Sequence, residues 1–207
     1  MKRGRSSNAW LHEHVTDPYV QRARSEGYRS RAAYKLKEID DKDHLIGPGR
    51  IIVDLGASPG GWSQVVTERC ARRGQVIAVD LIAMQPLAGV TFLQGDFFDP
   101  QILDHLEKLL AGNKVGLVLS DMAPNISGIA LCDQARVIAL AELALDFAGR
   151  WLQPDGAFLV KVFNGYGFDD FRRKMSLAFK TTALRKPSAS RDRSPEIYLL
   201  GRNPIAS

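Results

Sequence analysis

Residues 51–66, IIVDLGASPGGWSQVV, contain the signal that decides the fold. A short run of Ile, Val and Leu ends in a glycine-rich turn, and the residues after the turn have helical character. The run is nearly continuous in apolar residues, as in a parallel strand buried on both faces of a sheet. Such a turn lets the backbone approach a ligand, and the next helix presents free N–H groups. The segment therefore predicts a strand–turn–helix unit with a nucleotide-type ligand at the turn.

The same alternation of short apolar runs and longer amphipathic stretches continues to the end of the chain. Further strands are expected at 76–80, 90–93, 115–120, 157–163, 181–185 and 196–200. Helices are expected at 30–40, 61–72, 100–111, 132–151 and 168–179. The pattern predicts an α/β fold: a Rossmann-like, doubly wound and mostly parallel seven-stranded sheet flanked by helices.

The composition, with 45% hydrophobic and 25% charged residues, is that of a globular protein, and 207 residues suit one domain. Charged residues interrupt every apolar stretch before it reaches the length of a membrane span. The basic start, MKRGRSSNAW, lacks the apolar core of a secretory signal, so we expect a cytoplasmic protein without membrane contact. Neither the two cysteines nor the four histidines have metal-ligand spacing, and no metal site is expected.

Positive charge is concentrated near the two ends of the chain. Residues 1–37 hold nine lysines and arginines against three acidic residues, whereas the whole chain carries only +5. A second basic cluster comprises Arg185, Lys186, Arg191 and Arg193. Two basic clusters around a near-neutral body favour a polyanion partner over a merely solvated surface. We expect a basic, partly mobile extension over residues 1–26 and the folded domain over 27–207.

The glycine spacing in the turn narrows the class of ligand. A dinucleotide fingerprint begun at Gly56 would require glycine where Ser58 stands, and no Walker lysine follows Gly61. Glycines 56, 60 and 61 with Pro59 between them are common for S-adenosylmethionine, which carries no phosphate. An NAD-linked oxidoreductase remains the alternative that a cofactor titration would exclude.

Three acidic residues end successive strands: Asp54, Asp80 and Asp96. Any one of them could be only a helix N-cap. Together they favour an adenosyl-bearing or cationic ligand, with Asp80 placed for ribose hydroxyls and Asp96 for the adenine amino group. We therefore expect S-adenosylmethionine as the cofactor.

Two further charged residues point to chemistry at the same rim of the sheet. Asp121 closes the fourth strand, and Lys161 interrupts the apolar strand FLVKVF. A buried lysine costs desolvation free energy unless it is paired or opens onto a cleft; an edge-strand lysine reaching water is the alternative. The flanking valines, Val160 and Val162, indicate a central strand and favour a functional lysine.

Six motifs occur in order from about residue 10 to the end: RSRAAYKLKEI, VDLGASPGGWSQ, LQGDF, SDMAPNISG, VKVF and SRDRSPEIY. In these motifs the chain closely resembles the FtsJ/RrmJ family of ribosomal RNA uridine 2′-O-ribose methyltransferases. The resemblance implies a class I methyltransferase fold and methyl transfer from S-adenosylmethionine to a ribose 2′-hydroxyl of large-subunit (23S) ribosomal RNA. Ser58 and Pro195 depart from the usual pattern, but neither replaces a functional side chain.

The resemblance also implies the site residues. A catalytic tetrad falls on Lys35, Asp121, Lys161 and Glu196. The expected cofactor contacts, which include the glycine turn, are Asp54, Gly56, Pro59, Gly60, Gly61, Trp62, Asp80, Asp96 and Asp121. The candidate RNA contacts, where phosphate binding would set the register, are Arg22, Arg24, Arg29, Arg31, Arg191 and Arg193.

We expect Lys161 to orient the 2′-oxygen and to accept its proton, with Asp121 positioning Lys161 and Glu196 positioning Lys35. An ordinary lysine, with a pKa of about 10.4, is a poor base at neutral pH. Burial, Lys35 and the sulfonium would favour the neutral amine, whereas the two carboxylates would favour the ammonium ion. The sequence leaves both open; an ammonium would instead polarise the hydroxyl.

The expected partner is ribosomal RNA within the large ribosomal subunit, modified during ribosome maturation by a monomer that requires no protein partner. Transfer RNA or an mRNA cap is an alternative substrate. A protein that binds RNA without catalysis is an alternative of another class, which the intact tetrad disfavours.

Overall fold

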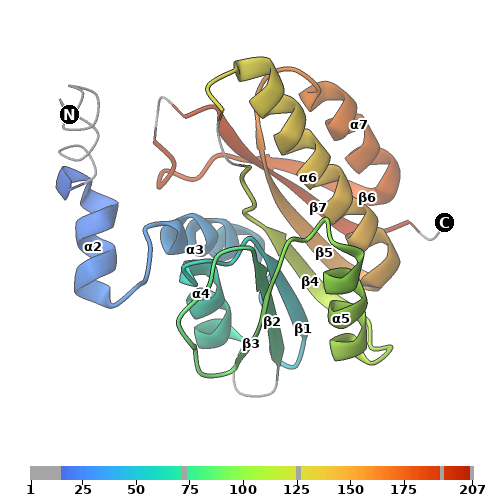
Figure 1. Cartoon of the computed structure of the whole chain (residues 1–207), viewed down its shortest axis with the longest axis horizontal. Coiled ribbons are helices and arrows are strands. Elements are labelled where there is room, and N and C mark those ends of the chain that lie inside the picture. Colours follow the sequence, from blue (N-terminus) through green and yellow to red (C-terminus); the bar gives the residue numbers. More distant parts are fainter. Residues whose placement is uncertain (1–14, 71–73, 125–126, 192–193, 206–207) are drawn as a thin grey trace.

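The computed structural model describes residues 15–70, 74–124, 127–191 and 194–205, and its centre is one seven-stranded sheet (Figure 1). The strands are β1 Ile51–Leu55, β2 Gln75–Asp80, β3 Val90–Gln94, β4 Val115–Ser120, β5 Leu152–Phe163, β6 Phe179–Arg185 and β7 Glu196–Pro204. Their order is β3-β2-β1-β4-β5-β7-β6. β7 is antiparallel to both of its neighbours, and all other pairs are parallel. The predicted mostly parallel seven-stranded sheet is confirmed.

Helices cover both faces of the sheet (Figure 1). They are α2 Pro18–Glu26, α3 Ala32–Asp43, α4 Gly61–Arg69, α5 Pro100–Leu110, α6 Ala130–Trp151 and α7 Phe168–Ala178. α3 and α4 pack on one face, while α5, α6 and α7 pack on the other. None of the helices found in the described ranges is long and apolar enough to span a membrane.

The central strand β4 shows why the sheet needs cover on both sides. All six of its residues are buried. Val118 belongs to the core beneath α5, α6 and α7, whereas Leu117 and Leu119 belong to the core beneath α3 and α4. Side chains alternate between the two faces of the sheet along a strand, so a continuous apolar run needs helices packed on both faces.

Two strand bounds differ from the prediction by more than two residues. β5 begins at Leu152, immediately after α6, rather than at residue 157, and its pairing with β4 shifts register between Val115 and Leu117. Residues 154–156, which lie between the predicted helix and the predicted strand, therefore belong to β5. β7 also continues beyond residue 200, to Pro204.

The described part of the N-terminal extension is a helix that packs against α3. Asp17 caps α2 by accepting from the Tyr19 N–H at 2.9 Å, Pro18 occupies the first turn, and Gly27 ends the helix at φ 80°. The Tyr19 ring lies 5.6 Å from the Tyr34 ring of α3. The start and stop signals of α2 were present in the sequence, but only Val20 and Ala23 are buried along it, so no helical apolar periodicity reveals it.

Candidate active site

The turn between β1 and α4 is shaped by two glycines with positive φ. Gly56 has φ 78°, and a Cβ there would lie 2.7 Å from the backbone N and Cα of Met122. Gly60 has φ 108°, and a Cβ there would lie 2.8 Å from Met84 Sδ. Larger residues would clash and be strained at both positions, so the turn can approach the segment after β4 only with glycine.

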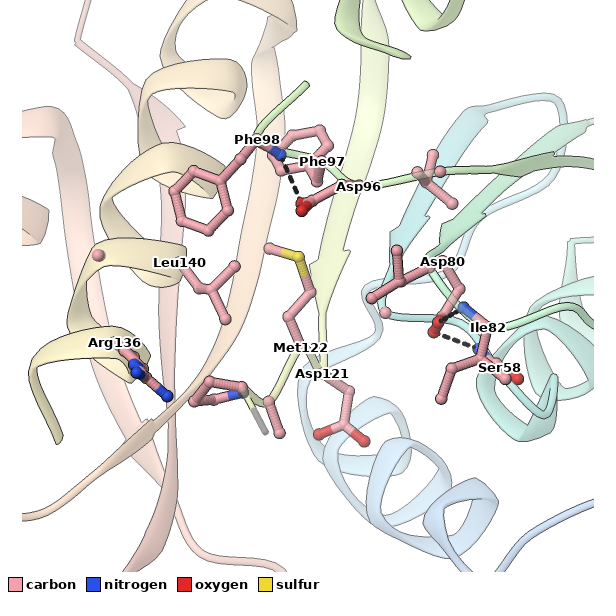
Figure 2. Close-up of a pocket in the computed structure, with 17 residues that line it drawn as sticks. Ser58, Asp80, Ile82, Asp96, Phe97, Phe98, Asp121, Met122, Arg136 and Leu140 are labelled. Carbon is pink, nitrogen blue, oxygen red and sulfur yellow. Dashed lines mark hydrogen bonds between the residues drawn. The ribbon is translucent and has the colours of Figure 1, made fainter. Parts of the chain in front are cut away.

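A pocket of about 620 Å³ opens beside this turn, between the carboxyl ends of β2, β3 and β4 on one side and α6 on the other (Figure 2). Asp80 lies at the end of β2, where its two oxygens accept from the Ser58 N–H at 2.8 Å and the Ile82 N–H at 2.7 Å. Asp96 follows β3 and accepts from the Phe98 N–H at 3.0 Å. Both carboxylates retain lone pairs for a ligand.

The pocket combines these carboxylates with apolar side chains. Its lining includes Gly56, Ser58, Asp80, Leu81, Ile82, Asp96, Phe97, Phe98, Asp121, Met122, Arg136 and Leu140. Leu81, Ile82 and Phe98 are more than half exposed. The sequence did not single out these apolar side chains, although each is adjacent to, or within two residues of, a predicted acid. Arg136 and Leu140 come from α6, four residues apart on one face (Figure 2).

Five of the predicted cofactor residues, Asp54, Pro59, Gly60, Gly61 and Trp62, do not line this pocket. Pro59, Gly60 and Gly61 belong to the turn itself but not to the lining. The Trp62 side chain is 2% exposed, and its indole N–H donates to the Ala32 carbonyl at 2.8 Å. The structure therefore assigns the Trp62 side chain to packing between α4 and α3.

Asp54 is completely buried and also faces away from the pocket, beneath α4. Ser63 Oγ donates to Asp54 Oδ2 at 2.7 Å, while Asp54 Oδ1 has no hydrogen-bond partner. Burial raises the pKa of Asp54 to about 7. The hydrogen bond from Ser63 lowers this pKa, whereas the negative charges of Asp121 and Asp80 raise it further. A carboxyl in this state supports the turn and the start of α4 from inside the protein.

The four predicted tetrad residues are brought together as two lysine–carboxylate pairs. Lys161 Nζ lies 2.7 Å from the Asp121 carbonyl oxygen and 3.0 Å from Asp121 Oδ1. Lys35 Nζ lies 2.6 Å from Glu196 Oε1 and 2.8 Å from Oε2. Lys161 and Glu196 are each 8% exposed, so these charges are largely desolvated and depend on their partners.

A second, strongly polar pocket of about 440 Å³ lies on the other side of the tetrad. It is lined by Arg31, Lys35, Arg191, Ser194 and Glu196. Asp121 lines the first pocket, so the two pairs lie between the pockets. The lysines and arginines suit the second pocket to an anion, and the first pocket suits a ligand with an apolar ring and hydroxyl or amino donors.

The arginines predicted to contact RNA differ in their surroundings. Arg29 donates to the carbonyl oxygens of Pro59, Gln85 and Pro86 at 3.3, 2.6 and 2.7 Å. These bonds give Arg29 a structural role that sequence reasoning missed, because it holds the loop after β2 against the glycine turn.

The remaining arginines lie around α2 and the second pocket. Arg22 pairs with Glu26 at 2.6 Å on the exposed face of α2, where Arg24 is also exposed. Arg31 pairs with Asp17 and donates to the Ala189 carbonyl, and Arg191 Nε lies 3.5 Å from the same Asp17 carboxylate. Arg193 lies outside the described residues.

Comparisons with known proteins agree with this geometry. A family model described as FtsJ-like methyltransferase matches residues 28–204. A protein of Thiobacillus denitrificans named ribosomal RNA large subunit methyltransferase E is 60% identical over 99% of this chain and 93% of its own length. A protein of the same name from Azoarcus sp. is also 60% identical, over 97% of this chain and 98% of its own.

Solved structures support the same fold. A ribosomal RNA methyltransferase of Plasmodium falciparum has a TM-score of 0.77 and 29% identity, over 87% of this chain and 100% of its own. A methyltransferase of Streptococcus mutans in complex with SAH has a TM-score of 0.51 over 78% of this chain and 90% of its own. Its identity of 12% makes it evidence for the fold alone. The expected class I methyltransferase fold is confirmed.

Proposed function

The chain belongs to the FtsJ-like methyltransferase family, and on that basis we propose that it transfers a methyl group to a ribose 2′-hydroxyl of large-subunit (23S) ribosomal RNA, at a uridine. The observation that carries this proposal is the position of the two lysine–carboxylate pairs. They lie between a pocket suited to an adenosyl group and a pocket suited to a phosphate. Residues 27–207 form the methyltransferase domain.

S-adenosylmethionine is the methyl donor, and the first pocket has the groups to hold it. Asp80 would accept hydrogen bonds from the ribose hydroxyls, Asp96 would accept one from the adenine amino group, and the exposed side chains of Ile82 and Phe98 would supply apolar surface for the adenine. Gly56 lets the turn pack against the Met122 backbone, which a Cβ would approach to 2.7 Å, and both residues line the pocket. When bound, the cofactor supplies an electrophilic methyl carbon on a sulfonium.

Lys161 is the residue that handles the proton of the acceptor. Its amine would orient the 2′-oxygen and take the hydroxyl proton as the oxygen–carbon bond forms and the methyl–sulfur bond breaks, with the electron pair left on the sulfur of the neutral thioether product. Asp121 positions this amine through two contacts, from its carbonyl and from its carboxylate. Glu196 holds Lys35 beside the second pocket, where the ammonium binds the RNA backbone.

The proposed partner is the ribosomal RNA of the large subunit, modified during ribosome maturation. The protein would act in the cytoplasm, as a monomer. Arg31 and Arg191 line the second pocket and contact a phosphate near the target nucleotide. Arg22 and Arg24 extend the basic surface along α2.

The decisive variant is Lys161→Ala, assayed with labelled cofactor on large ribosomal subunits. We expect methyl transfer to be abolished while the affinities for cofactor and RNA change by less than about threefold, because the amine acts in the transition state. Lys174→Ala, which removes an exposed lysine paired with Glu142, is the matched control and should retain full activity. Unchanged turnover of Lys161→Ala would refute the assigned role.

The substrate is tested by comparing intact large subunits, free ribosomal RNA and transfer RNA in the same assay. Preferred methylation of transfer RNA would contradict the proposed acceptor. No methylation of any RNA, together with retained RNA binding, would support a protein that keeps the fold without catalysis.

A further inference from the structure

A completely buried tyrosine hydroxyl lies between the two lysine–carboxylate pairs. Tyr198 is on β7 and is 0% exposed. Its hydroxyl lies 3.0 Å from Asp121 Oδ1, which belongs to the Lys161 pair. It also lies 3.3 Å from Glu196 Oε1, which belongs to the Lys35 pair. The distances place one phenol within hydrogen-bonding range of both acids of the tetrad.

The phenol has one proton and two acceptors. Burial and the two neighbouring carboxylates raise the pKa of Tyr198 well above its ordinary value, so the phenol keeps its proton at any pH at which the enzyme works. A hydroxyl can donate to only one acceptor in full at a time. The Tyr198 hydroxyl therefore donates its hydrogen bond to either Asp121 or Glu196, and its contact with Asp121 is the shorter of the two.

The sheet fixes the position of this hydroxyl. Tyr198 on β7 is the register partner of Lys161 on β5, so both side chains leave the sheet side by side. The tyrosine ring lies 5.7 Å from the Trp62 ring. Lys35 Nζ lies 6.0 Å from the centre of the tyrosine ring.

Among the described residues, the charged side chains of the tetrad surround Tyr198. Asp121 and Lys161 face it from the ends of β4 and β5, Glu196 from its own strand, and Lys35 from α3. Ser190 Oγ donates to Glu196 Oε1 at 2.9 Å. Glu196 thus has a second hydroxyl donor, whereas Tyr198 is the hydroxyl that reaches the Asp121 carboxylate.

We propose that Tyr198 is a positioning residue for methyl transfer: its single hydroxyl proton joins the Lys161–Asp121 pair and the Lys35–Glu196 pair into one network. The inference rests on the proposed function. The donated proton withdraws negative charge from Asp121 Oδ1, the same oxygen that faces Lys161 at 3.0 Å. Without it, the full carboxylate charge would favour the ammonium form of Lys161 over the amine that accepts the 2′-hydroxyl proton.

The test is Tyr198→Phe, which keeps the ring against Trp62 and removes only the hydroxyl. We expect the ascending limb of the pH profile of kcat to move by about one unit to higher pH, because one hydrogen bond to a charged group is lost. At pH 7 this shift is about a tenfold loss of kcat. The KM values for cofactor and RNA should change by less than about twofold, since Tyr198 does not line either pocket.

Tyr166→Phe is the matched control, because Tyr166 is 70% exposed and lies outside the tetrad. Its pH profile should superimpose on that of the wild type. A Tyr198→Phe profile that also superimposes, or that falls equally at every pH, would overturn the inference. An inactive wild-type enzyme on every RNA would instead refute the proposed function, so the two failures are distinguishable.

A double-mutant cycle tests the link between the pairs separately. Glu196→Gln removes the charge at the other end of the Tyr198 contact. If the hydroxyl joins the pairs, adding Tyr198→Phe to Glu196→Gln should cost less than the same change costs in the wild type. Losses of kcat that multiply independently would show two unconnected pairs and contradict the proposal. Thermal melting of all three variants confirms that folded protein is compared.

Discussion

The carboxyl of Asp54 makes the stability of the protein depend on pH in a direction opposite to that of most acids. Asp54 is 0% exposed beneath the glycine turn, with one oxygen bonded to Ser63 and the other without a partner. Asp54→Asn keeps the size of the side chain and an acceptor for Ser63 while removing the ability to ionise. The variant therefore resembles the protonated wild type at every pH.

The magnitude follows from the pKa of Asp54, which burial raises from 3.8 to about 7. Below pH 3.8 the acid is protonated in both the folded and the unfolded chain, and its contribution to stability is fully present. As the pH rises, the unfolded chain ionises first, and the folded state loses stability until the folded carboxyl also ionises near pH 7. Three pKa units at about 1.4 kcal/mol each amount to about 4 kcal/mol, of which about 3 kcal/mol falls between pH 5 and pH 8.

Urea denaturation of the wild type and Asp54→Asn at pH 5, 6, 7 and 8 measures this effect. The free energy of unfolding of the variant should gain about 3 kcal/mol relative to the wild type across this range. Asp104→Asn, which changes an exposed acid paired with Lys108, should parallel the wild type. A constant difference between Asp54→Asn and the wild type would show that Asp54 is ionised in the folded protein throughout, and would contradict the raised pKa.

Three further changes test other parts of the site. Asp80→Asn should weaken cofactor binding by about 10- to 100-fold in calorimetric titration, because a charged acceptor of the ribose hydroxyls is lost, and an affinity equal to that of Asp104→Asn would contradict this role. Asp17→Asn keeps the α2 cap but removes the negative charge that neutralises Arg31 and Arg191. RNA affinity should therefore rise, and its salt dependence should steepen. Weaker RNA binding would show instead that the ion pairs orient the two arginines for RNA. Gly56→Ala should destabilise the fold by about 1–3 kcal/mol in thermal melting, since its Cβ would lie 2.7 Å from the Met122 backbone, and an unchanged melting temperature would mean that the turn can relax.

The order of strands and helices could be predicted from the sequence because the periods of the apolar residues differ between them. The runs at 51–55 and 115–120 coincide with β1 and β4, because a strand buried on both faces has a nearly continuous apolar sequence. The proximity of Asp121 and Lys161 could be predicted because they lie at the carboxyl ends of neighbouring parallel strands. Register therefore places them at one rim of the sheet. Lys35 and Glu196, in contrast, were assigned to the tetrad only by the family resemblance.

Other features depend on contacts between distant segments that no local pattern records. In the sequence, nothing distinguishes Arg29 from the other basic residues of the N-terminal region. Its side chain nevertheless donates three hydrogen bonds to the backbone carbonyls of residues 59, 85 and 86, which give it a structural role. Trp62 and Asp54 belong to the cofactor motif, but their side chains point into the core. Tyr198 could have been found from the alternation in the motif EIY, which puts it on the same face as Glu196.

Methylation of a ribose 2′-hydroxyl of large-subunit ribosomal RNA leaves a modified nucleotide whose position can be mapped. Large subunits that lack the modification are incubated with the enzyme and isotopically labelled S-adenosylmethionine, and the digested RNA is analysed by mass spectrometry. We expect label on the ribose of a single uridine of the 23S RNA, and none with Lys161→Ala. Label on a base, on transfer RNA in preference to the subunit, or at an undiminished level with Lys161→Ala would contradict the proposed function.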